Sequence, residues 1–159
     1  FLAALERPEH LIDPALFDTT IPRDYKVTKL PAIVESITQQ SGEEHVIAVL
    51  RGYAQRTGGK FPAKLGDTAE YATLVSQSGQ KLNEDDIALM AYAGALTPFL
   101  MSLPKNEHAY LGENARLGDK DKIVFWYHDP KTKTYHAIYA DLTAREILAG
   151  DVPRPAAKP

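Results

Sequence analysis

Three histidines, His108, His128 and His136, form the one residue set that suggests a metal site, because neutral imidazole is a common ligand of zinc. In a hairpin register that places Tyr127 opposite Tyr135, His128 and His136 share a sheet face at diagonal positions, within reach of one ion. A third ligand would have to come from His108, Asp129 or Asp141. No tight ligand spacing such as His-x-x-x-His supports the site, and solvent-facing polar strand positions explain the same residues. We therefore assign no metal ligand and no cofactor, and keep a metal-dependent hydrolase that uses these histidines as an alternative function.

Carboxylates that could serve as a general acid or base occur as Glu43 and Glu44 beside His45, and as Asp85 and Asp86. All four lie in the first turns of predicted helices, where acidic side chains interact favourably with the helix dipole. The serines lack a Gly-x-Ser-x-Gly setting, and no Gly-x-x-x-x-Gly-Lys pattern for phosphate binding is present. We assign no catalytic residue and expect a protein that is not an enzyme.

Four aromatic residues are the best candidates for a binding surface. They are Trp126, Tyr127, Tyr135 and Tyr139, and together they could recognise a peptide, a glycan or a partner protein. The competing interpretation is that the same rings are core residues and cross-strand pairs. The two interpretations differ in the exposure of Trp126 and the tyrosines, because a contact surface requires exposed rings and a core requires buried ones.

The stretch that must position these groups is a predicted β-hairpin over residues 122–141. β-branched and aromatic residues fill strands at 123–128 and 134–141, around a loop at 129–133 that Asp-Pro opens. With Tyr127 opposite Tyr135, the second face carries Val124, Trp126, His128, His136 and Ile138. Both faces then hold large apolar groups, so helices must cover at least one of them.

Helix signals are strong in the first two thirds of the chain. Ser41-x-x-Glu44 is a capping box, and apolar residues then recur at helical spacing, which predicts a helix over residues 42–57. Asp67-x-x-Glu70 begins a second helix that runs to about Ser76 and closes near Gly79. Asn83 caps a third, which extends to about Leu103 and carries Pro98.

Residues 87–103 of the third helix form a run of 17 residues without a charge, the lower limit for a membrane span. Small and polar residues dilute this run, and basic flanking clusters are missing. We favour a buried central helix, with no transmembrane span within the chain.

Weaker signals complete the pattern. Residues 32–38 suggest a short helix, and residues 25–30 and 108–111 suggest short strands. After the hairpin, Thr143-x-x-Glu146 is a second capping box, which predicts a short helix that Gly150 ends.

These elements predict an α+β fold with three or four helices packed on a small antiparallel sheet built around the hairpin. Residues 1–30 form a connector, 31–150 a single domain, and 151–159 a flexible, proline-rich tail. The net charge of −3 and the lack of a basic block argue against nucleic-acid binding. The absence of cysteine excludes disulfides and thiolate metal sites.

Several short phrases resemble known envelope proteins. DPALFDTTIPRDY at residues 13–25 resembles the closing segment of LolA/RseB-like domains, and VIAVLRGYAQRTGGKFPAKL at 46–65 resembles a helix and its exit in uncharacterised planctomycete envelope proteins. The later phrases of that family match Leu103-Pro104, Tyr110-x-Gly112, Leu117-Gly118-Asp119, Phe125-Trp126-Tyr127 and Tyr139-x-Asp141-Leu142. Residues 50–62 also resemble a phrase of type II secretion pseudopilins, as a distant analogy.

The resemblance implies the C-terminal module of an exported protein, following a LolA-like domain that this chain does not contain, with a membrane anchor outside this chain. We therefore expect a non-enzymatic binding or assembly module of the bacterial cell envelope, periplasmic or secreted. Its partner would be another protein or an envelope complex, and its contact surface either the aromatics or the free edge of the sheet. A pseudopilin-like filament subunit is the further alternative.

Overall fold

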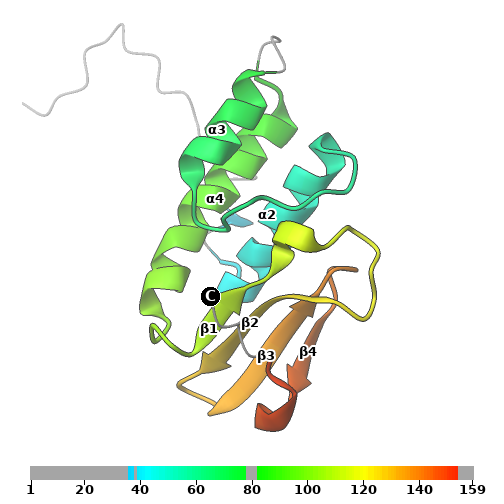
Figure 1. Ribbon diagram of the computed structural model, residues 1–159. Coiled ribbons are helices and arrows are strands. Elements are labelled where there is room, and N and C mark those ends of the chain that lie inside the picture. Colours follow the sequence, from blue (N-terminus) through cyan, green and yellow to red (C-terminus); the bar gives the residue numbers. More distant parts are fainter. Residues whose placement is uncertain (1–35, 38, 78–81, 154–159) are drawn as a thin grey trace, which may run out of the picture.

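The computed structural model describes residues 36–37, 39–77 and 82–153. Within these ranges three α-helices pack on one side of a four-stranded antiparallel sheet, so the predicted α+β class is confirmed (Figure 1). The predicted connector, the strand at 25–30 and most of the tail lie outside the described residues. Of the predicted helix at 32–38, only Ser36 and Ile37 are described, and both are helical.

Helix α2 spans Gly42–Arg56, close to the predicted 42–57. The capping box is complete: the Ser41 hydroxyl accepts from the Glu44 backbone, and the Glu44 carboxylate accepts from the Ser41 backbone at 2.7 Å. Val46, Val49 and Leu50 are fully buried, which is the apolar stripe that the sequence indicates. These local signals therefore fix both the position and the orientation of the helix.

Helices α3 (Thr68–Ser76) and α4 (Glu84–Ser102) also begin at their predicted caps, Asp67 and Asn83. Pro98 lies inside α4, near its C-terminal end. The helix packs against α2, and its Leu89, Ala93 and Leu96 are buried, while Met101 is 81% exposed. Across the described residues, no helix combines the length and apolarity that a membrane span needs.

The sheet has the strand order β1-β2-β3-β4, and every neighbouring pair is antiparallel. Strand β1 spans His108–Tyr110, β2 Ile123–Asp129, β3 Thr134–Tyr139 and β4 Ala144–Ile147. The two central strands are the predicted hairpin, and β1 is the predicted short strand at 108–111.

The register of the hairpin differs from the prediction by one residue. Tyr127 pairs with His136, and His128 pairs with Tyr135. Asp129 pairs with Thr134, so the connecting loop holds four residues, and Lys133 takes a left-handed backbone at φ 59°. Because side chains alternate between faces, the slip places residues 135–138 on the face opposite the predicted one relative to β2. A β-bulge between Ile123 and Phe125 restores the predicted pairing of Ile123 with Tyr139.

The predicted helix after the hairpin is wrong. Residues 144–147 form β4, an edge strand paired with β3, and a short 3₁₀ helix follows at Ala149–Asp151. Thr143 does not cap a helix; its backbone and hydroxyl both donate to the Asp141 carboxylate, at 3.0 and 2.6 Å. Leu142 takes a left-handed backbone at φ 65°, which turns the chain back along β3.

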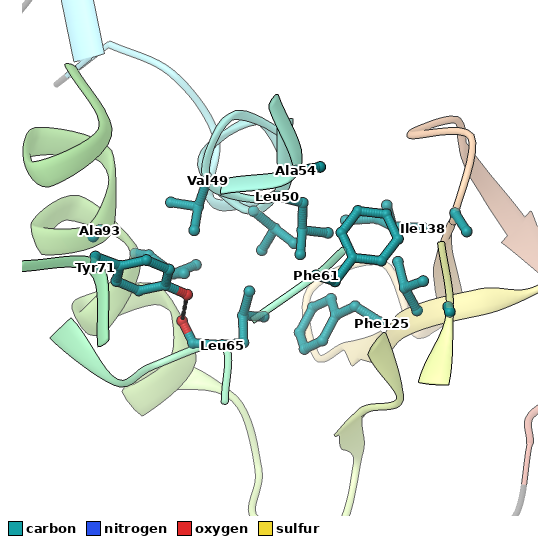
Figure 2. Close-up of a cluster of buried hydrophobic side chains, with 14 of the residues drawn as sticks. Val49, Leu50, Ala54, Phe61, Leu65, Tyr71, Ala93, Phe125 and Ile138 are labelled. Carbon is teal, nitrogen blue, oxygen red and sulfur yellow. Dashed lines mark hydrogen bonds between the residues drawn. The ribbon is translucent and has the colours of Figure 1, made fainter. Parts of the chain in front are cut away.

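The main core lies between the helices and the inner sheet face, the face turned toward them (Figure 2). Its largest fully buried side chains include Leu50 of α2, Tyr71 of α3, Leu96 of α4, and Phe125 and Ile138 of the sheet. The Tyr71 hydroxyl donates to the Leu65 carbonyl at 2.7 Å, so this buried polar group is paired. One continuous core therefore joins helices and sheet.

Candidate functional site

The three histidines of the predicted metal set do not converge. His108 and His136 project to the inner sheet face, whereas His128 projects to the outer one, because His136 lies beside Tyr127 rather than diagonal to His128. Among the described residues no group of three or more His, Cys, Asp or Glu side chains could hold a metal ion. The structure therefore does not support the hydrolase alternative that used these residues.

Each histidine has local partners that account for it. His108 Nδ1 lies 2.9 Å from the Pro104 carbonyl, and His128 Nδ1 lies 2.6 Å from the Glu107 carboxylate. The His136 ring stacks on Tyr127, with ring centroids 5.1 Å apart. These are structural contacts at strand ends and across strand pairs.

The predicted aromatic surface is divided between the two faces of the sheet. Tyr127 lies on the inner face, 7% exposed, and its hydroxyl donates to Glu43 at 3.0 Å. Burial, followed by the nearby Glu43 carboxylate, raises the pKa of Tyr127, so its hydroxyl stays a neutral donor. Trp126 lies on the outer face but is only 6% exposed. These two rings are therefore packing residues.

Tyr135 and Tyr139 remain half-exposed on the outer face. The Arg145 guanidinium lies over the Tyr139 ring, 4.8 Å from its centroid. A shallow hollow of about 160 Å³ lies beside Trp126 and Tyr135, with Ala149 and Val152 of the C-terminal segment on its wall. This face therefore offers less free aromatic surface than the sequence suggests.

The candidate acid–base residues serve the helix ends. Glu44 completes the α2 capping box, and Asp86 accepts from the Asn83 backbone at 3.1 Å and from Arg56 at 2.9 Å. The Asn83 backbone, followed by Arg56, holds the pKa of the Asp86 carboxyl below its ordinary value. Asp85 is exposed in the same turn. No catalytic arrangement brings these groups together.

The outer edge of β1 carries backbone groups that no strand of the described residues pairs with. The Leu111 amide donates to the Val124 carbonyl, and the His128 amide donates to the Glu107 carbonyl, both at 2.8 Å. Because hydrogen-bonded pairs alternate in an antiparallel ladder, the N–H and C=O groups of His108 and Tyr110 point away from β2. Within the described part of the chain, β2 is the one strand that pairs with β1. Among the described residues, the outer edge of β1 is thus unpaired.

A hollow of about 390 Å³ lies along this edge, on the inner side of the sheet. We call it the β1 groove. One wall is the loop between α2 and α3, the other is β1 itself, and Leu100 of α4 and Phe125 of β2 also line it. Its lining residues are Ala63, Lys64, Leu65, Gly66, Leu100, His108, Ala109, Tyr110 and Phe125.

Hydrogen bonds hold the loop wall of the β1 groove in place. The Tyr110 hydroxyl donates to the Pro62 carbonyl at 2.7 Å, and the Glu70 carboxylate accepts from the backbones of Ala63 and Lys64 at 3.0 and 3.3 Å. Glu70 also accepts from Tyr53 at 2.7 Å, and burial followed by this bond raises the pKa of Tyr53 to about 12. The wall is therefore fixed before any ligand arrives, which lowers the entropic cost of binding.

Sequence reasoning identified the strand and named a free sheet edge as one contact surface, but it missed the groove. Lys64 is distant from His108 along the chain, and no local pattern indicates that the two line one groove. The Tyr110–Pro62 hydrogen bond, across 48 positions, is the contact that brings loop and strand together.

The opposite edge of the sheet differs. Strand β4 has three exposed residues in sequence, Ala144, Arg145 and Glu146, and none of them lines either of the two hollows described above. Charged side chains on an edge strand discourage pairing with another chain. The β1 edge is therefore the better candidate for a binding site.

The chain was compared with protein families, curated proteins and solved structures. No family model matches it, and neither a curated protein nor a solved structure does.

Proposed function

We propose that this domain is a protein-binding or assembly module, in which an extended segment of a partner protein adds to the sheet along β1. The observation that carries the proposal is the set of outward backbone groups of His108 and Tyr110 beside a groove with a fixed wall. In strand addition, backbone hydrogen bonds supply affinity, and pockets for alternate side chains supply specificity. Both parts are present at this edge.

The lining of the β1 groove favours binding over catalysis. It contains no Ser, Cys, Asp or Glu side chain, and its titratable members are Lys64, His108 and Tyr110. Burial, more than any nearby charge, raises the pKa of Tyr110, and its hydroxyl is held by Pro62. A nucleophile paired with a general base is therefore missing from the lining.

The short length of β1 sets the strength of binding. Four outward groups, two amides and two carbonyls, are available from His108 and Tyr110. Each hydrogen bond contributes roughly 1 kcal/mol net, and one buried apolar side chain adds about 2 kcal/mol, against the cost of association. These contributions sum to about 6 kcal/mol before the cost of association is subtracted, so we expect a weak contact with a Kd above about 100 µM, suited to reversible assembly.

We also propose that the module works in the bacterial cell envelope, within a larger exported assembly. The support is the resemblance of residues 13–25 and 46–65, and of the later short phrases, to envelope proteins. Cell fractionation of the source organism with an antibody against the chain tests the location. Recovery in the cytoplasmic fraction alone would reject it.

The binding proposal is tested with the full chain and peptides selected from a phage-displayed random nonapeptide library. The key variant is His108→Pro, which removes an outward amide without breaking a β1–β2 hydrogen bond. We expect this variant to bind the selected peptides about tenfold or more weakly, since one hydrogen bond is lost and the proline ring crowds the edge of β1. Isothermal titration calorimetry measures the change.

Two matched variants serve as controls. His108→Ala removes the imidazole but keeps the amide, and should change affinity less than about threefold. Glu146→Pro places the same ring at an outward amide of β4, on the opposite edge, and should leave binding unchanged. Equal binding by wild type and His108→Pro would overturn the proposal.

Hydrogen exchange locates the contact independently. In the free protein the amides of His108 and Tyr110 should exchange fast and that of Ala109 slowly, and peptide should protect the first two. Protection of His108 and Tyr110 before peptide is added would mean that another segment of this chain occupies the edge, and would also overturn the proposal.

A further inference from the structure

The chemistry of the β1 groove specifies what kind of segment it accepts. We infer that the partner segment carries an apolar side chain that enters the groove and an acidic side chain two positions away on the same face. This inference rests on the proposed strand addition at β1 and adds the partner's side-chain chemistry to it.

The apolar requirement follows from the floor of the groove. Phe125 is 1% exposed and belongs to the main core, and Leu65, on the loop wall, is 4% exposed. Leu100 of α4 is half-buried and borders the same space. A side chain that projects inward from a strand beside β1 would therefore contact carbon atoms of two core residues and one helix residue. An apolar group there leaves water, which favours binding.

The acidic requirement follows from the charges on the groove. Lys64 lies on its wall and is exposed, and none of the ion pairs of the described residues involves it. No acidic side chain lines the groove. Residues two positions apart in a strand project to the same face, so a carboxylate next to the apolar residue on that face comes within reach of the Lys64 ammonium.

The same charge argues against a second copy of this chain as the occupant. Two β1 edges paired with each other would bring the positively charged Lys64 loops of both copies to one contact. Like charges at close range are unfavourable, whereas an acidic segment is complementary. The partner is therefore a different, acidic and extended segment.

The test uses four synthetic nonapeptides on a common threonine–valine background. The first has a central leucine with glutamates two positions before and after it. The second has lysines in place of the glutamates, the third has serine in place of the leucine, and the fourth scrambles the first. We expect the glutamate peptide to bind about threefold to fivefold more tightly than the lysine peptide at low salt, and the serine peptide to bind at least tenfold more weakly. Excess salt should reduce the difference between the glutamate and lysine peptides and leave the difference between the leucine and serine peptides unchanged.

Charge reversal at Lys64 tests whether this residue causes the preference for the glutamate peptide over the lysine peptide. Lys64→Glu should reverse the order of the glutamate and lysine peptides, while the leucine-to-serine ratio stays the same. The matched control is Lys131→Glu, which makes the same change of net charge in the hairpin loop, away from the groove, and should leave the order unchanged. An unchanged order in Lys64→Glu would overturn the acidic part of the inference.

The outcomes separate this inference from the proposed function. If all four peptides bind equally and His108→Pro still abolishes binding, strand addition stands and the side-chain inference is wrong. If none of these peptides binds, and the selected library peptides bind His108→Pro as tightly as wild type, the proposed function itself is wrong.

Discussion

Trp126, the single tryptophan, lies between two alanines on the outer sheet face. Its cross-strand neighbours are Ala109 on β1 and Ala137 on β3, and the indole is 6% exposed although α2, α3 and α4 all pack on the other face. The small neighbours leave room for the ring. Its Nε1 is buried and has no hydrogen-bond partner, which is costly for a polar atom.

Substitution of this residue measures its packing. Trp126→Ala should lower the free energy of unfolding by about 3–5 kcal/mol, because it leaves a cavity that the two alanines cannot fill. Trp126→Phe should cost only about 1 kcal/mol, since it keeps most of the ring and removes the unpaired N–H. Urea unfolding measures both. A near-neutral Trp126→Ala would identify the ring as a contact residue instead.

Asp86 makes stability depend on pH. Its carboxyl pKa is held below the ordinary 3.8, first by the Asn83 backbone and then by Arg56. A depressed carboxyl pKa contributes stability that is fully present above the ordinary value and is lost as the pH falls through the depressed value. Asp86→Asn should therefore destabilise the protein at neutral pH and match wild type more closely below the depressed pKa.

The control for this variant is Asp85→Asn, which removes an exposed carboxylate from the same helical turn and should change little. Thermal unfolding measured from about pH 2 to about pH 7 compares the two. A destabilisation by Asp86→Asn that is constant across this range would show that packing, rather than charge, is its role.

At the scale of elements, the space around two helical glycines shows which helix face is packed and which is open. A Cβ on Gly42, at the start of α2, would overlap the ring of Phe99 of α4. Phe99 in turn packs edge-on against Tyr127, at 5.3 Å between ring centroids. A Cβ on Gly94, on the exposed side of α4, would meet nothing within 4 Å.

We therefore expect opposite effects from the same substitution. Gly42→Ala should destabilise by about 1–3 kcal/mol, because Phe99 must move and with it the contact of helix and sheet. Gly94→Ala should stabilise by about 0.5–1 kcal/mol, because alanine loses less conformational entropy in a helix. Urea unfolding of both variants tests this; a gain in stability from Gly42→Ala would contradict the tight packing.

At the scale of the whole molecule, one core predicts one unfolding transition. The main core includes residues of α2, α3, α4, β2 and β3, so neither layer keeps a core of its own when the other unfolds. Fluorescence of Trp126 reports on the sheet, and far-ultraviolet circular dichroism reports mainly on the helices. The two transitions should coincide in urea. An earlier fluorescence transition would mean that the sheet and the helices unfold separately.

The candidate site shows what a sequence can reveal at this scale. The strand at 108–111 and the idea of a free edge came from the sequence, but the groove depends on contacts between residues far apart in the chain. Tyr110 and Pro62, and Glu70 with Ala63, are such contacts. Neither the faces of His128 and His136 nor the burial of Trp126 could be known without the register.

The sequence by itself determined the three helices and their first residues, because caps and apolar spacing act within a few positions of each other. The tertiary structure decided the strand register and the fate of residues 143–150. Thr143 and Glu146 match a capping box, yet pairing with β3 and the hydrogen bonds from Thr143 to Asp141 make this segment a strand. Strand pairing is set by partners elsewhere in the chain, and a slip of one residue changes every face.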